Sequence, residues 1–178
     1  MTNTEPQKQT GGAMAQALLA QFEQEMASTR RALERVPFDN GDWAPHEKSM
    51  TLGRLAGHIA EMPGWGASIL ESTEFDMHPP GGEPYASPEI KSTEELLAMF
   101  DAGVAATTAK LPSMSNEDMM VHWRLLSGGE EVMGGPRGPI FTGMILSHVI
   151  HHRGQLTVYL RLNDVPVPAI YGPSADEQ

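Results

Sequence analysis

Three histidines in this chain have the residue type and spacing expected of metal ligands. His148 and His152 lie in "SHVIHHRGQLTVYLR" and stand four residues apart on an apolar helical stripe. On a helix their Cβ atoms are about 6 Å apart, so both imidazoles can reach one ion. His58 stands in the middle of a second apolar stripe on an earlier predicted helix. Facing helices that each carry an inward histidine predict a metal pocket in the core.

A plainer interpretation applies to each histidine taken alone. A single histidine on an apolar face is usually a core residue that hydrogen-bonds a neighbour. Three imidazoles in one core are costly to desolvate, and a shared ligand offsets that cost. Three neutral imidazoles also leave a coordination position open, as catalytic metal sites do. The pattern therefore predicts a divalent ion (Zn, Ni or Fe) without choosing one. Because the chain has no cysteine, a thiolate ligand from the protein is excluded.

Six further residues are candidates for the pocket or for contacts that support the ligands. They are Glu61, Trp65, His151, Arg153, Gln155 and Tyr159. Glu61 follows His58 by one turn; it orients a ligand or serves as a base, although a solvated side chain is the interpretation we favour. Trp65 continues the stripe of His58. The pattern identifies none of the six as catalytic.

The candidates on the last helix are equally open to two interpretations. His151 points off the main stripe and either supports a ligand or lies at the surface. Arg153 forms either a structural salt bridge, which we favour, or a clamp for an anionic ligand. Gln155 and Tyr159 continue the inward stripe as polar groups of a pocket, although hydrogen bonding within the core explains them equally well.

Four amphipathic helices must position these residues. Apolar residues at spacings of three and four predict helices over 13–36, 51–72, 92–111 and 140–163. Pro63 predicts a kink or local break in the second helix. Partial alternation around 121–126 predicts a short hairpin or irregular excursion between the third and fourth helices. The expected fold is an all-α four-helix bundle, with 1–12 as a disordered lead-in and 13–178 as a single domain.

Two blocks of sequence, "GHIAEMPGW" and "SHVIHHRGQLTVYLRLNDVPVPAIYGPS", resemble the DinB/YfiT-like superfamily. The most recognisable stretch is His-x3-His-Arg-Gly-Gln, and the resemblance spans about residues 13–174. It implies an up-down-down-up four-helix bundle with metal ligands at His58, His148 and His152. The chain departs from the pattern at Pro63 and in a long insertion at 76–91, which we expect to reshape the mouth of the pocket.

The same resemblance implies an activity. Members include transferases and isomerases that use low-molecular-weight thiols such as bacillithiol or mycothiol. An open divalent site lowers the pKa of a bound thiol. We therefore expect a metal-dependent enzyme that activates such a thiol toward a small-molecule substrate. The alternative is a non-catalytic, stress-related protein that binds a metal or a small ligand.

Charge and hydropathy narrow the range of partners. The formal net charge is −11, with 12 Lys and Arg against 23 Asp and Glu. This balance argues against nucleic acid, whose phosphates require basic residues, and against anionic membrane surfaces. No apolar run approaches the roughly 18 residues of a membrane span, and "MTNTEPQKQTGG" lacks the apolar core of a signal peptide. We expect a cytoplasmic protein without nucleic-acid or membrane partners.

The first predicted helix carries more apolar surface than one buried stripe requires. Ala15, Leu19, Phe22 and Met26 form a second row beside the main one. Such a row predicts a two-fold homodimer that buries part of the first or fourth helix, and the resemblance implies the same. The alternative is that the 76–91 loop or the Pro-rich tail covers the row.

Overall fold

A computed structural model describes residues 11–177 and shows a mainly helical protein with a small three-stranded sheet. The long helices are α1 (Ala13–Leu33), α2 (Leu52–Glu71), α3 (Thr93–Lys110) and α6 (His148–Leu162). The short helical segments are η1 (Phe38–Asn40), η2 (Leu111–Ser113), α4 (Asn116–Met120), α5 (Arg137–Phe141) and the π-helical η3 (Thr142–Ser147). The strands are β1 (Glu74–Asp76), β2 (His122–Ser127) and β3 (Glu130–Pro136). Residues 1–10 of the predicted lead-in lie outside the described residues.

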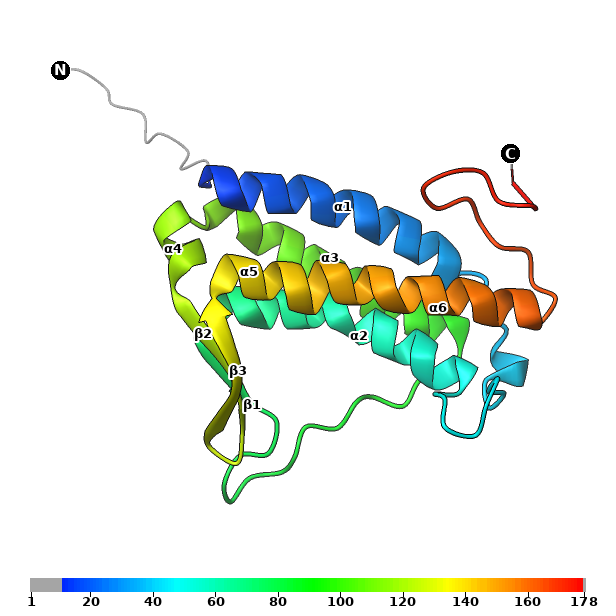
Figure 1. Ribbon diagram of the computed structural model, residues 1–178, viewed down its shortest axis with the longest axis horizontal. Helices are drawn as coiled ribbons and strands as arrows, with labels where there is room; N and C mark the ends of the chain where they lie inside the picture. The colour runs from blue at the N-terminus through cyan, green and yellow to red at the C-terminus, as the bar shows by residue number, and fades with distance from the viewer. Residues whose placement is uncertain (1–10, 178) are drawn as a thin grey trace.

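The long helices lie side by side, and α5, η3 and α6 follow one another as a single rod (Figure 1). In this view α1 and α6 run in one direction and α2 and α3 in the other. Helix α2 packs against α3 and α6, and α1 packs against the same two helices. This continuous helical segment begins at Arg137, whereas the sequence predicts a start at residue 140. The earlier start is possible because Pro139 falls in the first helical turn, where its missing N–H costs no hydrogen bond. Within residues 11–177, none of the helices combines the length and apolar character needed to cross a lipid bilayer.

The sequence predicts a kink or a local break at Pro63, and the break is wrong. The helix continues from Leu52 to Glu71 with Pro63 inside it. Helix α3 packs tightly against this turn: the Thr107 hydroxyl donates to the Pro63 carbonyl at 2.6 Å. A Cβ on Gly103 would lie 2.6 Å from the Gly64 nitrogen, so the two backbones approach closely. This tertiary packing holds the helix together despite the hydrogen bond that proline removes.

The expectation of a strictly all-α fold is wrong, because the protein contains a sheet with the order β1-β2-β3. The predicted excursion between the third and fourth long helices is the antiparallel hairpin β2–β3, whose turn places Gly128 and Gly129 at φ of 65° and 81°. Strand β1 pairs parallel to β2 and was not predicted. It has only three residues, and its pairing partners lie about 50 residues along the chain, so no local pattern marks it. The Asp76 carboxylate accepts hydrogen bonds from both glycine amides and fixes this end of the sheet.

The second apolar row of the first helix faces the interior of this chain. Ala15, Phe22 and Met26 are buried, and Leu19 packs partly buried against the core. The C-terminal tail also lies along α1: Tyr171 donates a hydrogen bond to Glu25 there. The row is therefore covered by the chain itself to a large extent, which removes it as a reason to expect a dimer through α1.

Candidate metal centre

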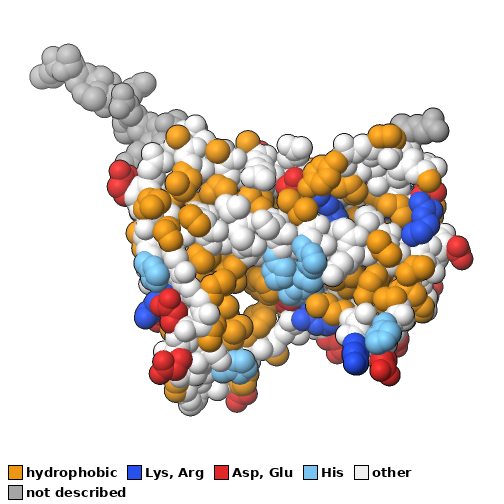
Figure 2. Space-filling model, in the orientation of Figure 1, with side chains coloured by type: hydrophobic (Ala, Val, Ile, Leu, Met, Phe, Trp, Pro, Cys, Tyr) orange, Lys and Arg blue, Asp and Glu red, His pale blue; other side chains and the backbone are white. Residues whose placement is uncertain are grey.

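The side chains of His58, His148 and His152 meet between α2 and α6. One ring nitrogen from each lies within 4.8 Å of those of the other two. The ring centroids are 5.1 Å apart for His58 and His148, 4.8 Å for His58 and His152, and 4.7 Å for the pair on α6. The His152 side chain is buried and the other two are partly buried. In Figure 2 histidine side chains gather at the centre of this face of the molecule.

A π-helical segment, η3, directly precedes the histidine pair of α6. A π turn inserts an extra residue into a helix and is often found at functional sites. Ile145 within that segment is fully buried, and His148 and His152 then follow on the face that contacts α2. The spacing of four residues thus places both rings on one face, as the sequence predicts.

Hydrogen bonds fix the orientation of the His58 ring. Its Nδ1–H donates to Glu61 Oε1 at 2.9 Å, which leaves Nε2 free for an ion. The Glu61 carboxylate also accepts from the Tyr85 hydroxyl at 2.8 Å and from the Ser87 hydroxyl at 3.1 Å. Burial raises the pKa of Glu61, but the hydrogen bonds from His58, Tyr85 and Ser87 together lower it below its ordinary value. Glu61 is therefore a buried, ionised carboxylate that fixes the His58 ring, and the solvated alternative is wrong.

His152 has a corresponding partner on its own helix. Its Nδ1–H donates to Gln155 Oε1 at 2.6 Å, so Nε2 is again the free nitrogen. The Gln155 amide in turn donates to the exposed His151 ring at 3.2 Å. Metal-binding histidines usually hold their second nitrogen in such a bond, which fixes both tautomer and ring orientation. Gln155 therefore fixes the orientation of the His152 ring, and neither Gln155 nor His151 belongs to the three-histidine cluster.

The donor set fits a divalent metal ion. Burial lowers the pKa of His152 from 6.5 to about 4, with the neighbouring histidines acting in the same direction. Burial also lowers the pKa of His148, and so does His58. Both rings are thus neutral at physiological pH, as a metal ligand must be. Three ring nitrogens that converge, two of them on rings whose opposite nitrogen is already hydrogen-bonded, match a three-histidine site with an open coordination position.

This shift in pKa has a measurable consequence for the metal-free protein. The pKa of His152 is lower in the folded chain than in the unfolded chain. As the pH falls from about 6.5 to about 4, the unfolded chain therefore binds more protons than the folded chain does. Stability should therefore be intact above this window and fall within it. We expect an NMR titration to give a His152 midpoint near 4, with urea unfolding midpoints that decrease over the same range. A midpoint at or above the ordinary histidine value would contradict the burial of this ring.

Arg153 and Tyr159 lie away from the three histidines. Arg153 is 1% exposed and pairs with Glu25 on α1 at 2.7 Å, so it forms the structural salt bridge that the sequence analysis favoured. Tyr159 donates from its hydroxyl to the Met50 carbonyl at 3.2 Å and packs edge-on against Trp43. Neither contact reaches the histidine cluster, and the suggestion of a pocket role for these two residues is not supported.

Trp65 lies beside the cluster, as the sequence predicts. Its ring centroid is 5.5 Å from that of His58 and 6.2 Å from that of His148. Its indole N–H donates to the Tyr85 hydroxyl at 3.1 Å. Tyr85 and Ser87 belong to the 76–91 segment and were missed, because a Pro- and Gly-rich loop carries no periodicity. The one signal was Tyr85 itself, a lone aromatic residue in a polar loop.

Removing Glu61 should weaken the metal site without unfolding the chain. Glu61→Ala leaves His58 Nδ1 without its acceptor, and we expect Zn(II) affinity to fall roughly 10- to 100-fold, the usual effect of losing such a partner. The measurement is competition with a chromophoric chelator. Glu71→Ala is the matched control, since Glu71 lies on the same helix and is exposed, with an ion pair to Lys110. Equal affinity in both variants would show that Glu61 does not support the site.

Comparisons with known proteins agree with this architecture. The family model described as DinB family matches residues 6–178. The uncharacterized protein YrdA of Bacillus subtilis (strain 168) is 27% identical over 161 residues, which cover 89% of each chain. Two solved structures share the fold. A DinB-like protein from Bacillus cereus ATCC 10987 gives a TM-score of 0.65 at 23% identity and covers 92% of this chain and 99% of its own. A DinB-like protein (YjoA) from Bacillus subtilis gives 0.61 at 17% identity, with coverage of 91% and 99%. With nearly the whole sequence matched by the family model, this chain belongs to the DinB family.

Proposed function

We propose that this protein is a divalent-metal-dependent enzyme that activates a low-molecular-weight thiol and transfers it to a small electrophilic substrate. The observation that carries the proposal is the convergence of three ring nitrogens, two of them on rings fixed by hydrogen bonds to Glu61 and Gln155. Three ligands leave room for a further group on the ion. A divalent ion at this position lowers the pKa of a bound thiol, which makes it nucleophilic at neutral pH.

The residues around the cluster have separate roles in this proposal. His58, His148 and His152 would hold the ion, while Glu61 and Gln155 keep two of these rings in the required tautomer. Glu61 is already engaged by three donors and has a lowered pKa, so it positions His58 and is poorly suited to accept a proton from the thiol. The thiol proton would leave to solvent. A carbon–sulfur bond would form as the leaving group departs with its electron pair.

A panel of thiols tests the activity. Metal-loaded protein is incubated with monochlorobimane and, in turn, bacillithiol, mycothiol, glutathione and coenzyme A, and the fluorescent conjugate is followed. We expect one thiol to react faster with the loaded protein than with either the metal-free protein or His152→Ala. Full metal occupancy with no rate above background for any thiol would favour the alternative, a non-catalytic protein that binds a metal or small ligand.

Three broader proposals accompany the activity. The parallel and antiparallel course of the long helices supports an up-down-down-up four-helix bundle to which the sheet is added. A low-molecular-weight thiol stays reduced in the cytoplasm, so we propose that location. The domain is proposed to extend from residue 13 to the C-terminus, in keeping with the packing of the tail on α1.

A homodimer through α6 is also proposed. Val158 and Leu162 stand one turn apart on this helix and are 56% and 57% exposed. Two large apolar side chains on one exposed face favour association with a second copy. Light scattering should give about twice 19.3 kDa for the wild type and about 19.3 kDa for Val158→Glu/Leu162→Glu. A monomeric wild type at tens of micromolar would refute the dimer.

A further inference from the structure

A cavity of about 590 Å³ lies between the helices and the sheet, directly beside the histidine cluster. Its volume is within the range of about 300–1,000 Å³ that small-molecule sites occupy. The sheet supplies one wall through Phe75 on β1, Leu125 on β2 and Met133 on β3. Figure 2 shows the molecule hollowed at this point, with hydrophobic side chains around the hollow and histidines at its edge.

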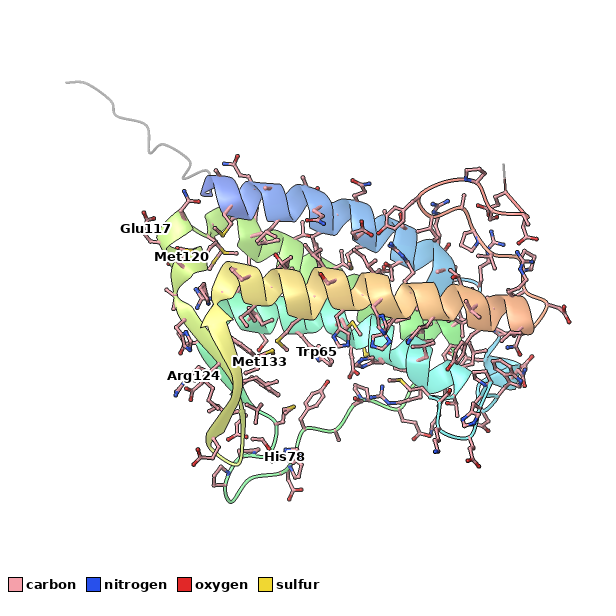
Figure 3. The ribbon with its side chains drawn as sticks, viewed as in Figure 1. Trp65, His78, Glu117, Met120, Arg124 and Met133 are labelled. Atoms are coloured by element: carbon pink, nitrogen blue, oxygen red, sulfur yellow. The ribbon has the colours of Figure 1, made fainter. Side chains whose placement is uncertain are left out.

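The helices supply the opposite wall, and this wall includes the metal centre. Trp65 and Met144 line the cavity, and so does His148, one of the three clustered histidines. In Figure 3, Trp65 and Met133 lie on the two sides of the space between the helices and the hairpin. Because His148 belongs to both features, a molecule in the cavity would lie beside any ion that the cluster holds.

The lining selects for neutral, apolar groups. Among the described residues that form it, none is Asp, Glu, Lys or Arg, and most are aromatic, methionine or aliphatic. Methionine and aromatic side chains adapt to flat, polarizable molecules through dispersion and sulfur–aromatic contacts. An anionic or strongly hydrated group would lose its solvation here without a charged partner.

The lining residues also remain partly exposed, although they are large and apolar. Phe75 is 36% exposed, Met133 37% and Tyr85 41%. Exposed apolar surface that is contiguous and concave marks a ligand site more often than an accident of packing. Covering it with a ligand removes this surface from water and is favourable in proportion to the area buried.

We propose that this cavity is the binding site for the neutral, apolar or aromatic part of the electrophilic substrate. The assignment of the occupant as substrate rests on the proposed function, whereas the preference of the cavity for apolar molecules does not. The sheet would thereby act as a specificity element, because its inner face would hold the body of the substrate beside His148. The polar remainder of the thiol must extend elsewhere, since no Asp, Glu, Lys or Arg side chain among the described residues lines the cavity.

A neutral fluorescent probe, N-phenyl-1-naphthylamine, tests the site in the metal-free protein. Gly143 lines the cavity from η3, and a Cβ there would meet no atom within 4 Å, so Gly143→Leu fills the space without a backbone clash. Gly154 on α6 is equally open and lies outside the lining, so Gly154→Leu is the matched control. We expect saturable binding with energy transfer from tryptophan in the wild type and in Gly154→Leu. Affinity should be weakened about tenfold or more in Gly143→Leu, because the added side chain occupies the site.

A second pair of variants keeps the test valid if Gly143→Leu folds poorly. Met133→Glu places a carboxylate in the lining from an exposed strand position, and Val132→Glu changes its neighbour, which is 56% exposed and outside the lining. Probe affinity should fall in the first and stay at the wild-type value in the second. Equal probe affinity in both members of each pair, or no saturable binding of the probe to the wild type, would overturn the proposal.

Zn(II) binding measured on the same variants distinguishes failure of the cavity proposal from failure of the metal-site proposal. Normal metal uptake without probe binding would leave the metal proposal intact, and probe binding without thiol transfer would leave an apolar site without the proposed reaction.

Discussion

Substitution of His152 by alanine is expected to abolish stoichiometric binding of a divalent metal ion while the fold is retained. The ring nitrogens of the three histidines lie within 4.8 Å of one another, and removing one leaves only two protein ligands. Loss of a supporting residue alone typically weakens a metal site roughly 10- to 100-fold, so loss of a ligand should exceed that range. Elemental analysis after dialysis and calorimetric titration with Zn(II) measure the effect.

His151→Ala is the matched control for that substitution. His151 is exposed and adjacent in sequence, and its ring centroid is 4.8 Å from that of His152. It is absent from the cluster of converging nitrogens, and its ring packs edge-on against His152 and accepts a hydrogen bond from Gln155. It should therefore retain one ion per chain. One ion per chain in His152→Ala, or loss of the ion in both variants, would mean that the three clustered histidines are not the ligand set.

The helical core and the histidine cluster were predictable because both depend on local periodicity. The spacing of His148 and His152 places them on one face of a helix whichever partner that helix has. The stripe around His58 likewise identifies an inward face, and one contact between α2 and α6 then brings the three rings together. For the three histidines, the spacing of a few neighbouring residues is therefore enough to predict which face of the helix each side chain occupies.

The wall of the cavity and the contacts of Glu61 were not predictable on the same basis. Phe75 belongs to a three-residue strand that exists only by pairing with β2, far along the chain. Tyr85 and Ser87 donate hydrogen bonds to Glu61 from a loop without periodicity. Only the folded chain shows that the insertion at 76–91 covers Glu61, the hydrogen-bond partner of His58. The residues that would determine substrate choice are thus those whose position depends on long-range contacts.

The buried ion pair between Arg153 and Glu25 is expected to dominate the stability of the last helix. The side chains are 2% and 7% exposed, and Arg153 also donates to the Thr29 hydroxyl at 3.2 Å and to the Tyr171 hydroxyl at 2.7 Å. Arg153→Met removes one partner and leaves the Glu25 carboxylate buried with a single hydroxyl donor. The free energy of unfolding should fall by about 3–5 kcal/mol, the usual cost of an uncompensated buried charge. Urea denaturation of the metal-free protein measures it.

Two further variants separate the ion pair from other effects of changing an arginine on α6. Glu25→Met/Arg153→Met removes both charges and should recover most of the lost stability, because a buried ion pair is often replaceable by apolar groups of similar volume. Arg161, also on α6, is exposed and pairs with Asp176 in the C-terminal tail. Arg161→Met should therefore change the unfolding midpoint little.

The ion pair between Arg153 and Glu25 lies on a different side of α6 from the histidine cluster. Because consecutive residues on a helix point about 100° apart, Arg153 is directed toward α1 while His152 faces α2. Zn(II) stoichiometry should therefore survive in Arg153→Met under conditions where it remains folded. A stability close to that of the wild type would show that Glu25 finds solvent or another donor once the arginine is gone.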